Sequence, residues 1–188
     1  IVTNFLSYSN SPIFKHRVDH LTHIVKNDGQ KKNKKSEEKD IRYLFTKSGL
    51  FTSTVAEAGA FVKTKEELEI PNIQFHYAPA MIVDHGRTPL WGTGMSCHSC
   101  LLRPKSRGEV TLASADPFAD PLIDPKFLSH PDDMKDMVEG YKIMMKVLGT
   151  EPFSKYISDH TRRPIDINDD TDIEQAMREE ADTVYHPV

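Results

Sequence analysis

The sequence predicts an α+β fold, in which a largely antiparallel β-sheet carries helices packed on one face. Alternating apolar residues indicate a run of strands, and apolar residues at helical spacing indicate helices later in the chain. Strands and helices in separate runs are typical of α+β folds. One hydrophobic core can form in a chain of 188 residues, so we expect residues 1–188 to be a single domain.

The first 48 residues are expected to form a helical insert. Asn10-Ser11-Pro12 is typical of a helix start, because proline is favoured at the first helical position. Three histidines follow on or beside a partly apolar stripe, but no carboxylate–histidine motif accompanies them, so we predict no metal site there. They are His16, His20 and His23. Residues 26–40 are polar throughout and predict a mobile surface loop, and a short helix is expected over about 37–47.

Residues 49–188 are expected to hold the sheet and its helices. The strands are predicted near 53–63, 72–83, 95–103 and 108–114. In the first strand, one face carries Thr54, Ala56, Ala58, Ala60 and Val62, and the other carries Val55, Glu57, Gly59 and Phe61. A carboxylate on a half-apolar face needs a charged partner or a wet cavity. For Glu57 two interpretations stay open: a ligand contact, or an internal ion pair with Arg103 or Arg107.

The segment after Gly108 begins as a strand and continues as turns. Val110, Leu112 and Ser114 alternate with Thr111 and Ala113. Three Asp-Pro pairs follow at four-residue spacing, and each proline pushes the preceding residue towards extended backbone. They are Asp116-Pro117, Asp120-Pro121 and Asp124-Pro125. The segment therefore cannot be a helix.

Two helices are predicted in the last third of the chain. The first begins at Ser129-His-Pro-Asp132, a capping-box-like start, and the second at the capping box Thr171-Asp-Ile-Glu174. Core positions at helical spacing in the first helix are Met134, Met137, Val138, Tyr141, Met145 and Leu148. Those of the second helix are Ile173, Ala176, Met177 and Ala181. The methionines are expected to be adaptable core packing.

The only two cysteines, Cys97 and Cys100, form a Cys-x-x-Cys motif. Such a motif can be a redox pair or half of a zinc site. Residues three apart in a strand point to opposite faces, however, so we expect the two thiols to diverge. We therefore predict neither a disulfide nor a metal here.

The composition excludes several classes of function. A net charge of −4 with 28% charged residues gives no sign of nucleic-acid binding. No apolar run approaches 18 residues, so no membrane-spanning segment is predicted, and no signal peptide is visible. No Gly-x-Gly-x-x-Gly turn occurs among the nine glycines, so we expect this chain alone to bind neither FAD nor a nicotinamide cofactor.

Four blocks of the sequence together resemble the glucose–methanol–choline (GMC) oxidoreductases. They are residues 53–62, 71–79, 101–130 and 181–188, in the family's order. The resemblance covers roughly residues 49–188 and implies the substrate-binding domain of a larger FAD-dependent enzyme, whose FAD-binding domain this chain lacks. Such an enzyme oxidises a primary alcohol to the aldehyde by hydride transfer to flavin. We expect this chain alone to be inactive, and we expect a cytoplasmic location, with a peripheral position at the inner membrane as the alternative.

The resemblance also implies roles for individual residues. His186 in Tyr-His-Pro-Val matches the catalytic histidine of the family, and an imidazole suits removal of the alcohol proton because it titrates near neutral pH. Glu57 and Val184 are the expected substrate contacts. Glu57 matches a glutamate that holds the trimethylammonium group in choline-binding members, and Phe75, Tyr77 and Trp91 could complete an aromatic cage. Choline and an aliphatic alcohol both stay open. The alternative from another class is a stand-alone, non-catalytic domain for ligand binding or assembly.

Overall fold

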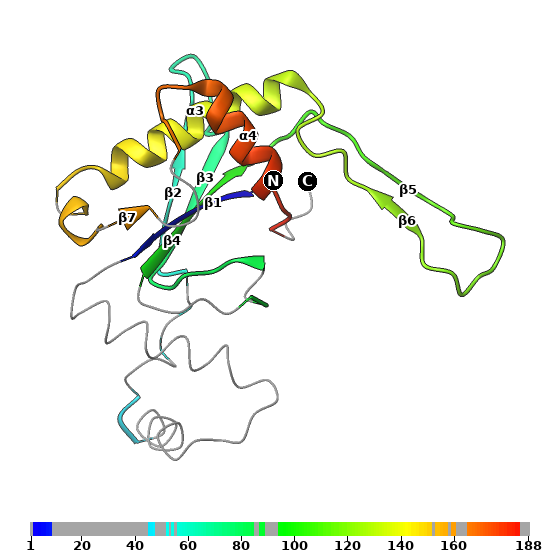
Figure 1. The fold of residues 1–188 in the computed structure, drawn as a ribbon, viewed down its shortest axis with the longest axis horizontal. Coiled ribbons are helices and arrows are strands. Elements are labelled where there is room, and N and C mark those ends of the chain that lie inside the picture. The colour runs from blue at the N-terminus through cyan, green and yellow to red at the C-terminus, as the bar shows by residue number, and fades with distance from the viewer. Residues whose placement is uncertain are drawn as a thin grey trace.

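The computed structural model of the chain describes residues 2–8, 45–47, 52, 54, 56–84, 87–88, 94–151, 153–157, 159–160 and 165–184. Within these residues a five-stranded antiparallel sheet lies against two long helices, and a separate two-stranded ribbon projects from the body (Figure 1). The predicted α+β fold, a largely antiparallel sheet with helices, is confirmed.

The main sheet has the strand order β2-β3-β4-β1-β7. Its strands are β1 (Val2–Tyr8), β2 (Ala58–Val62), β3 (Ile73–Ala78), β4 (Gly94–Leu101) and β7 (Asp159–His160). Each strand is antiparallel to its neighbours. The sheet therefore joins the start of the chain to its middle and to its last third.

Strand β1 corrects the prediction of a purely helical insert over residues 1–48. It pairs with β4 along its whole length, from Val2 opposite Cys100 to Tyr8 opposite Gly94. The segment lacks regular apolar alternation, so its strand structure depends on long-range pairing with β4. The predicted helix start at 10–12, the three histidines and the loop 26–40 lie outside the described residues. Of the predicted helix 37–47, the structure describes only the last three residues, of which Phe45 and Thr46 are helical.

Two of the predicted strands begin or end elsewhere. Strand β2 begins at Ala58 instead of residue 53, because Thr54 and Ala56 form a tight turn, with the N–H of Ala56 donating to the carbonyl of Thr54 at 2.9 Å. Strand β3 ends at Ala78, since Pro79 has no N–H with which to continue the ladder. The register of β2 confirms the predicted alternation, because Ala58 and Ala60 stand opposite Tyr77 and Phe75, but both alanines are exposed and are not buried under the helices.

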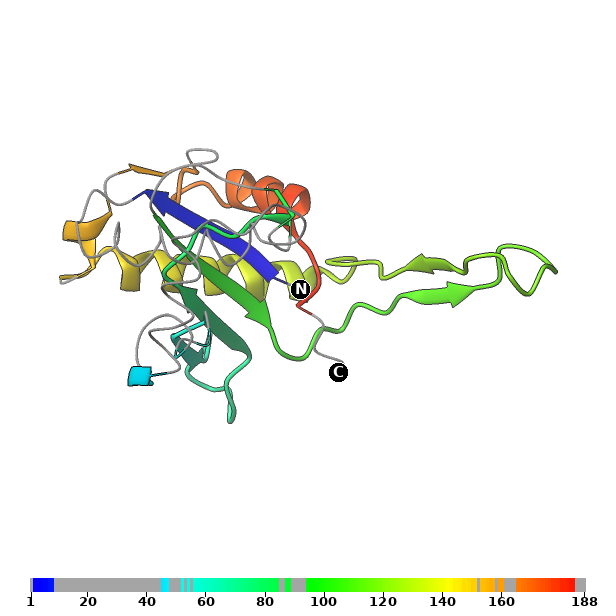
Figure 2. The same ribbon diagram turned by 90° about the horizontal axis from the view of Figure 1, so that it is seen from below.

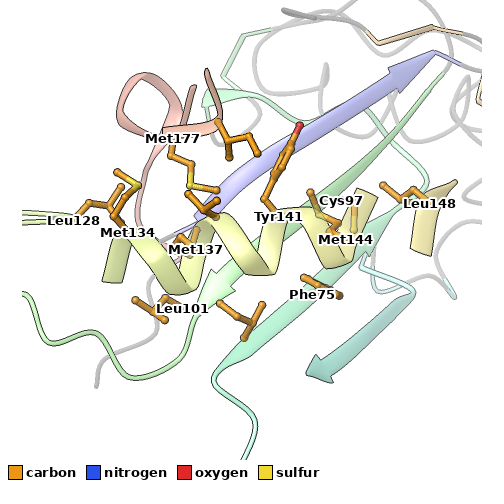
Figure 3. Packing of buried hydrophobic residues seen from close by; sticks show 13 residues of the cluster. Phe75, Cys97, Leu101, Leu128, Met134, Met137, Tyr141, Met144, Leu148 and Met177 are labelled. Atoms are coloured by element: carbon orange, nitrogen blue, oxygen red, sulfur yellow. The ribbon is translucent and has the colours of Figure 1, made fainter. Parts of the chain in front are cut away.

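Helices α3 (Pro131–Leu148) and α4 (Asp170–Glu180) cover one face of the main sheet. Figure 3 shows the core between these helices and the sheet, in which side chains of α3 meet those of β3 and β4. The fully or almost fully buried members are Ile73, Phe75, Cys97, Leu101, Leu128, Met134, Met137, Val138, Tyr141, Met144, Leu148, Ile173 and Met177. The helical spacing predicted the members from α3 and α4, except that Met144 is buried, whereas Met145 and Ala181 are only half-buried.

Both helix starts are shifted by one or two residues from the predicted caps. The cap of α3 is His130, whose Nδ1 accepts from the N–H of Asp132 at 3.2 Å, instead of Ser129. The cap of α4 is Asp169, whose side chain accepts from the N–H of Thr171 at 2.9 Å, instead of Thr171 itself. In each case a nearby acceptor satisfies the free N–H groups of the first turn as well as the predicted residue would.

The fourth predicted strand is not part of the main sheet. Strand β5 (Glu109–Thr111) pairs with β6 (Leu122–Asp124), and Val110 stands opposite Ile123. We call residues 108–125 the arm. Figures 1 and 2 both show it extending away from the sheet and helices. The first two Asp-Pro pairs thus lie towards the far end of a hairpin, whereas Asp124 of the third pair stands opposite Glu109 at its base. Strand β6 is not predicted by the turn-rich sequence.

Candidate functional site

The face of the main sheet that α3 and α4 do not cover is the candidate site. Residues directly opposite each other in an antiparallel sheet point to the same side, so the register assigns each side chain to a face. The helix-free face carries Gly59 and Phe61 of β2, Gln74 and His76 of β3, and Ser96, His98 and Cys100 of β4. Phe61 is mostly exposed on this face, although it is a large aromatic side chain.

Two histidines stand side by side on this face. His76 of β3 is directly opposite His98 of β4, a position in which Cβ atoms are about 5 Å apart. Burial, and to a smaller extent the imidazole of His76, lowers the pKa of His98 from 6.5 to about 4. His98 is therefore a neutral imidazole near pH 7, with one N–H donor and one acceptor nitrogen.

One nitrogen of His98 is buried without satisfying its hydrogen-bonding capacity. Its Nε2 atom is shielded from solvent and has no hydrogen-bond partner in the structure. Such an atom costs free energy and is rare in native proteins, where a catalytic role, strain, or a bound water or ion accounts for it. A small polar group that forms a hydrogen bond with Nε2 would remove this cost in free energy.

Ser96 fixes one border of the helix-free face. It is fully buried, its hydroxyl donates to the carbonyl of Ala80 at 2.7 Å, and it accepts from the N–H of Ile82 at 2.8 Å. These two bonds tie the segment that follows β3 to the start of β4. His98 lies two residues further along β4 on the same face, so it is held by a firmly attached strand.

The predicted site residues enter from different parts of the fold. Glu57 immediately precedes β2, an edge strand of the sheet, and its side chain is exposed. Val184 is half-buried and follows α4, a helix that packs against β1. His186 lies outside the described residues. Arg103, one of the two proposed ion-pair partners of Glu57, donates to the carbonyl of Pro71. Glu57 and Val184 do not lie on adjacent strands.

The prediction of an aromatic cage is wrong for two of its three residues. Phe75 and Tyr77 are on the helix-covered face: Phe75 is buried in the core, and the ring of Tyr77 packs edge-on against Phe153 at 5.7 Å. Glu57 precedes β2, so the alternation of that strand does not assign its side chain to a face. The third member, Trp91, lies outside the described residues.

The cysteines diverge as predicted. Cys97 stands opposite Tyr77 on the helix-covered face, and Cys100 stands opposite Gln74 on the helix-free face. Both are free thiols, and burial raises the pKa of Cys97 to about 12 and also raises that of Cys100. Among the described residues, no group of three or more His, Cys, Asp or Glu side chains could hold a metal ion.

Comparison with known proteins now decides the family. Residues 104–188 match the family described as GMC oxidoreductase. The chain is 42% identical over 146 residues to an alcohol dehydrogenase [acceptor] of Pseudomonas putida, a match that covers 78% of this chain and 26% of that protein. This chain belongs to the GMC oxidoreductase family. It is also 34% identical over 146 residues to an oxygen-dependent choline dehydrogenase of Rhizobium rhizogenes, covering 78% of this chain and 27% of that protein.

Solved structures of GMC flavoproteins have the same fold. A formate oxidase from Aspergillus oryzae superposes with a TM-score of 0.78 at 20% identity, over 100% of this chain and 35% of that chain. The GMC chain described here therefore spans roughly a quarter of the curated relatives and about a third of this solved relative. In the part that the structure describes, no helix is both long and apolar enough to cross a membrane.

The histidine pair is a candidate that sequence reasoning missed. His76 lies within the block 71–79 that carries the GMC resemblance, and His98 lies between the two cysteines. Period-two alternation places each histidine on one face of its own strand. Only the register between β3 and β4 shows that the two are direct neighbours.

Proposed function

We propose that this GMC chain is the substrate-binding part of a longer FAD-dependent dehydrogenase that oxidises a primary alcohol to the aldehyde. The observation that carries the proposal is the helix-free sheet face, on which His98 presents a buried, unsatisfied nitrogen beside His76. Family membership supports the reaction class, and the relatives' greater length supports the presence of a further, flavin-binding part.

The helix-free face fits a small polar ligand better than it fits the phosphates of a dinucleotide. His98 is neutral near pH 7, so it can exchange a hydrogen bond with a hydroxyl group without carrying a charge. Exposed Phe61 adds an apolar surface two strands away on the same face. We propose that an alcohol lies against this face in the longer protein. In the longer protein, FAD supplies the hydride acceptor.

The chain's own residues would then bind and orient the alcohol. We propose that His186 takes the hydroxyl proton, because an imidazole can act as a base near neutral pH. His98 would hold the substrate oxygen through its Nε2 atom, and its strand β4 is held between β3 and β1. Val184 and Glu57 would be substrate contacts at the margin.

An aliphatic alcohol is the favoured substrate class. The carboxylate of Glu57 is exposed, and the aromatic rings of Phe75 and Tyr77 belong to the other face, so the described residues do not build a cage for a quaternary ammonium group. The higher identity to the alcohol dehydrogenase than to the choline dehydrogenase agrees with this choice.

The test uses the longer protein that contains this chain. Its flavin is followed under anaerobic conditions while straight-chain primary alcohols, choline or 3,3-dimethylbutanol are mixed with it. We expect reduction by the straight-chain alcohols. His186→Ala should slow that step by about 10²–10⁴-fold with a much smaller effect on the alcohol's dissociation constant. A purified longer protein without flavin, or one that no primary alcohol reduces, would refute the proposed function.

Glu57→Gln separates the two substrate classes. If Glu57 holds a trimethylammonium group, the variant should weaken choline binding but leave the neutral isostere 3,3-dimethylbutanol unaffected. We expect instead that choline and 3,3-dimethylbutanol respond alike to the variant. A loss of affinity confined to choline would show that the aliphatic-alcohol assignment is wrong.

A further inference from the structure

The arm is firmly attached to the body at its base. The buried carboxylate of Asp133, in the first turn of α3, accepts hydrogen bonds from the N–H groups of Lys105 and Ser106, each at 2.8 Å, and from the Ser106 hydroxyl at 2.5 Å. The same hydroxyl accepts from the N–H of His130 at 3.0 Å. The segment that leads into the arm is thus bonded to the helix that follows the arm.

The arm also closes tightly where its two strands leave the body. A Cβ atom at Gly108 would lie 2.3 Å from the carbonyl oxygen of Asp124, so no larger residue fits there without moving the backbone. The Lys126 ammonium and the Glu109 carboxylate, 3.0 Å apart, form an ion pair across this closure. Asp116 stiffens the far end by accepting from the N–H of Phe118 at 3.0 Å. The arm therefore leaves the body in a defined direction.

Large apolar side chains nevertheless project from the arm into solvent. Each is at least 59% exposed: Val110, Leu112, Phe118, Leu122 and Ile123. Val110 and Ile123 are direct cross-strand partners and so share one side of the hairpin. A two-stranded hairpin alone is marginally stable in water, and soluble proteins rarely leave such a concentration of apolar groups uncovered. The arm therefore has the properties of a surface that another protein segment covers.

The greater length of the relatives favours the rest of the same polypeptide as that segment. This chain covers only 26% of its alcohol dehydrogenase relative, and the arm is within the region 104–188 that matches the family. Residues 102–107 connect the arm to Leu101, the last residue of β4, and the neighbouring Cys100 stands opposite Val2 of β1. The segment leading to His186 follows α4, which packs against β1. The arm and the proposed catalytic segment are thus connected to the same strand pair.

We propose that the arm docks on the flavin-binding part of the longer polypeptide and clasps it to this domain. This inference rests on the proposed function, because it takes the missing part to be the one that binds FAD. The apolar side of the hairpin, with Val110, Ile123 and the adjacent Leu112, forms the contact, and Phe118 extends it at the far end.

The test is site-specific photo-crosslinking in the longer protein. A benzophenone amino acid replaces Phe118, a residue that is 93% exposed and whose replacement leaves this domain's core intact. After illumination, mass spectrometry identifies the attached peptide. We expect an intramolecular crosslink to the flavin-binding part. The matched control carries the benzophenone at Val147, an exposed apolar residue of α3 outside the arm, and should give no such product.

A second variant measures the consequence of undocking. Leu112→Asp places a charge on the apolar side of the arm, and Val147→Asp does the same on α3. Leu112→Asp should lower the temperature at which FAD is released by several degrees, and Val147→Asp should leave that temperature unchanged. A covalent dimer through position 118 would identify a second copy as the occupant and overturn the inference, as would no crosslink at all. Either result leaves alcohol-dependent flavin reduction measurable, so failure of the arm's role and failure of the proposed function are separate outcomes.

Discussion

Replacing His98 by phenylalanine should change the pH dependence of stability in a predictable direction. The pKa of His98 is about 4 in the folded chain and 6.5 as an ordinary histidine, because burial and the neighbouring His76 disfavour the imidazolium. Between these values the unfolded chain binds a proton that the folded chain does not. The free energy of unfolding therefore falls as the pH falls from 6.5 towards 4.

The size of this effect follows from the two pKa values. The full difference corresponds to about 3 kcal/mol, and the part lost between pH 7 and pH 5 is about 2 kcal/mol. His98→Phe removes that contribution to the pH dependence. It also removes the unsatisfied Nε2 atom, so the variant should be more stable than the parent chain by about 1 kcal/mol at pH 7.

Urea denaturation of the chain at pH 7 and pH 5 measures both effects. The control variant Gln74→Leu makes a polar-to-apolar change on the same face without removing a titrating group, and it should keep the parent's pH dependence. If the parent and His98→Phe lose the same stability between the two pH values, His98 is not held neutral by burial, and our account of the site fails.

Three further predictions concern the core and the base of the arm. Asp133→Asn should cost about 2–3 kcal/mol, because a buried carboxylate that accepts three hydrogen bonds loses an acceptor, whereas the exposed neighbour Asp132→Asn should leave the urea midpoint almost unchanged. Burial alone would raise the pKa of Asp133, but the three hydrogen bonds outweigh burial and lower the pKa. The stabilisation that the ionised carboxylate gives is therefore present above about pH 4 and is lost on further acidification. Equal urea midpoints for the two variants would contradict the role of Asp133. Met137→Ala should cost about 2–5 kcal/mol, since the side chain is fully buried, and exposed Val147→Ala far less. The thiol of Cys97 should react with a disulfide reagent at pH 8 only after unfolding, since its pKa is about 12, and rapid labelling of the native chain would show that it is accessible.

The sequence by itself determined the local features that depend on near neighbours. Apolar spacing located α3 and α4 and most of the residues they bury, because an amphipathic helix encodes its buried face in a repeat of a few residues. Alternation assigned Ala58 and Ala60 to the face opposite Gly59 and Phe61. Motif blocks in a fixed order were sufficient to identify the GMC family.

The tertiary structure alone decided features that depend on distant partners. Strand β1 exists because it pairs with β4, some ninety residues later, and nothing in its own pattern requires that pairing. The arm left the main sheet because β5 pairs with β6 across the Asp-Pro turns. His76 and His98 became one site through the register of β3 and β4, in which a shift of one residue would place them on opposite faces. Register is a property of two strands together, so no single segment of the sequence can encode it.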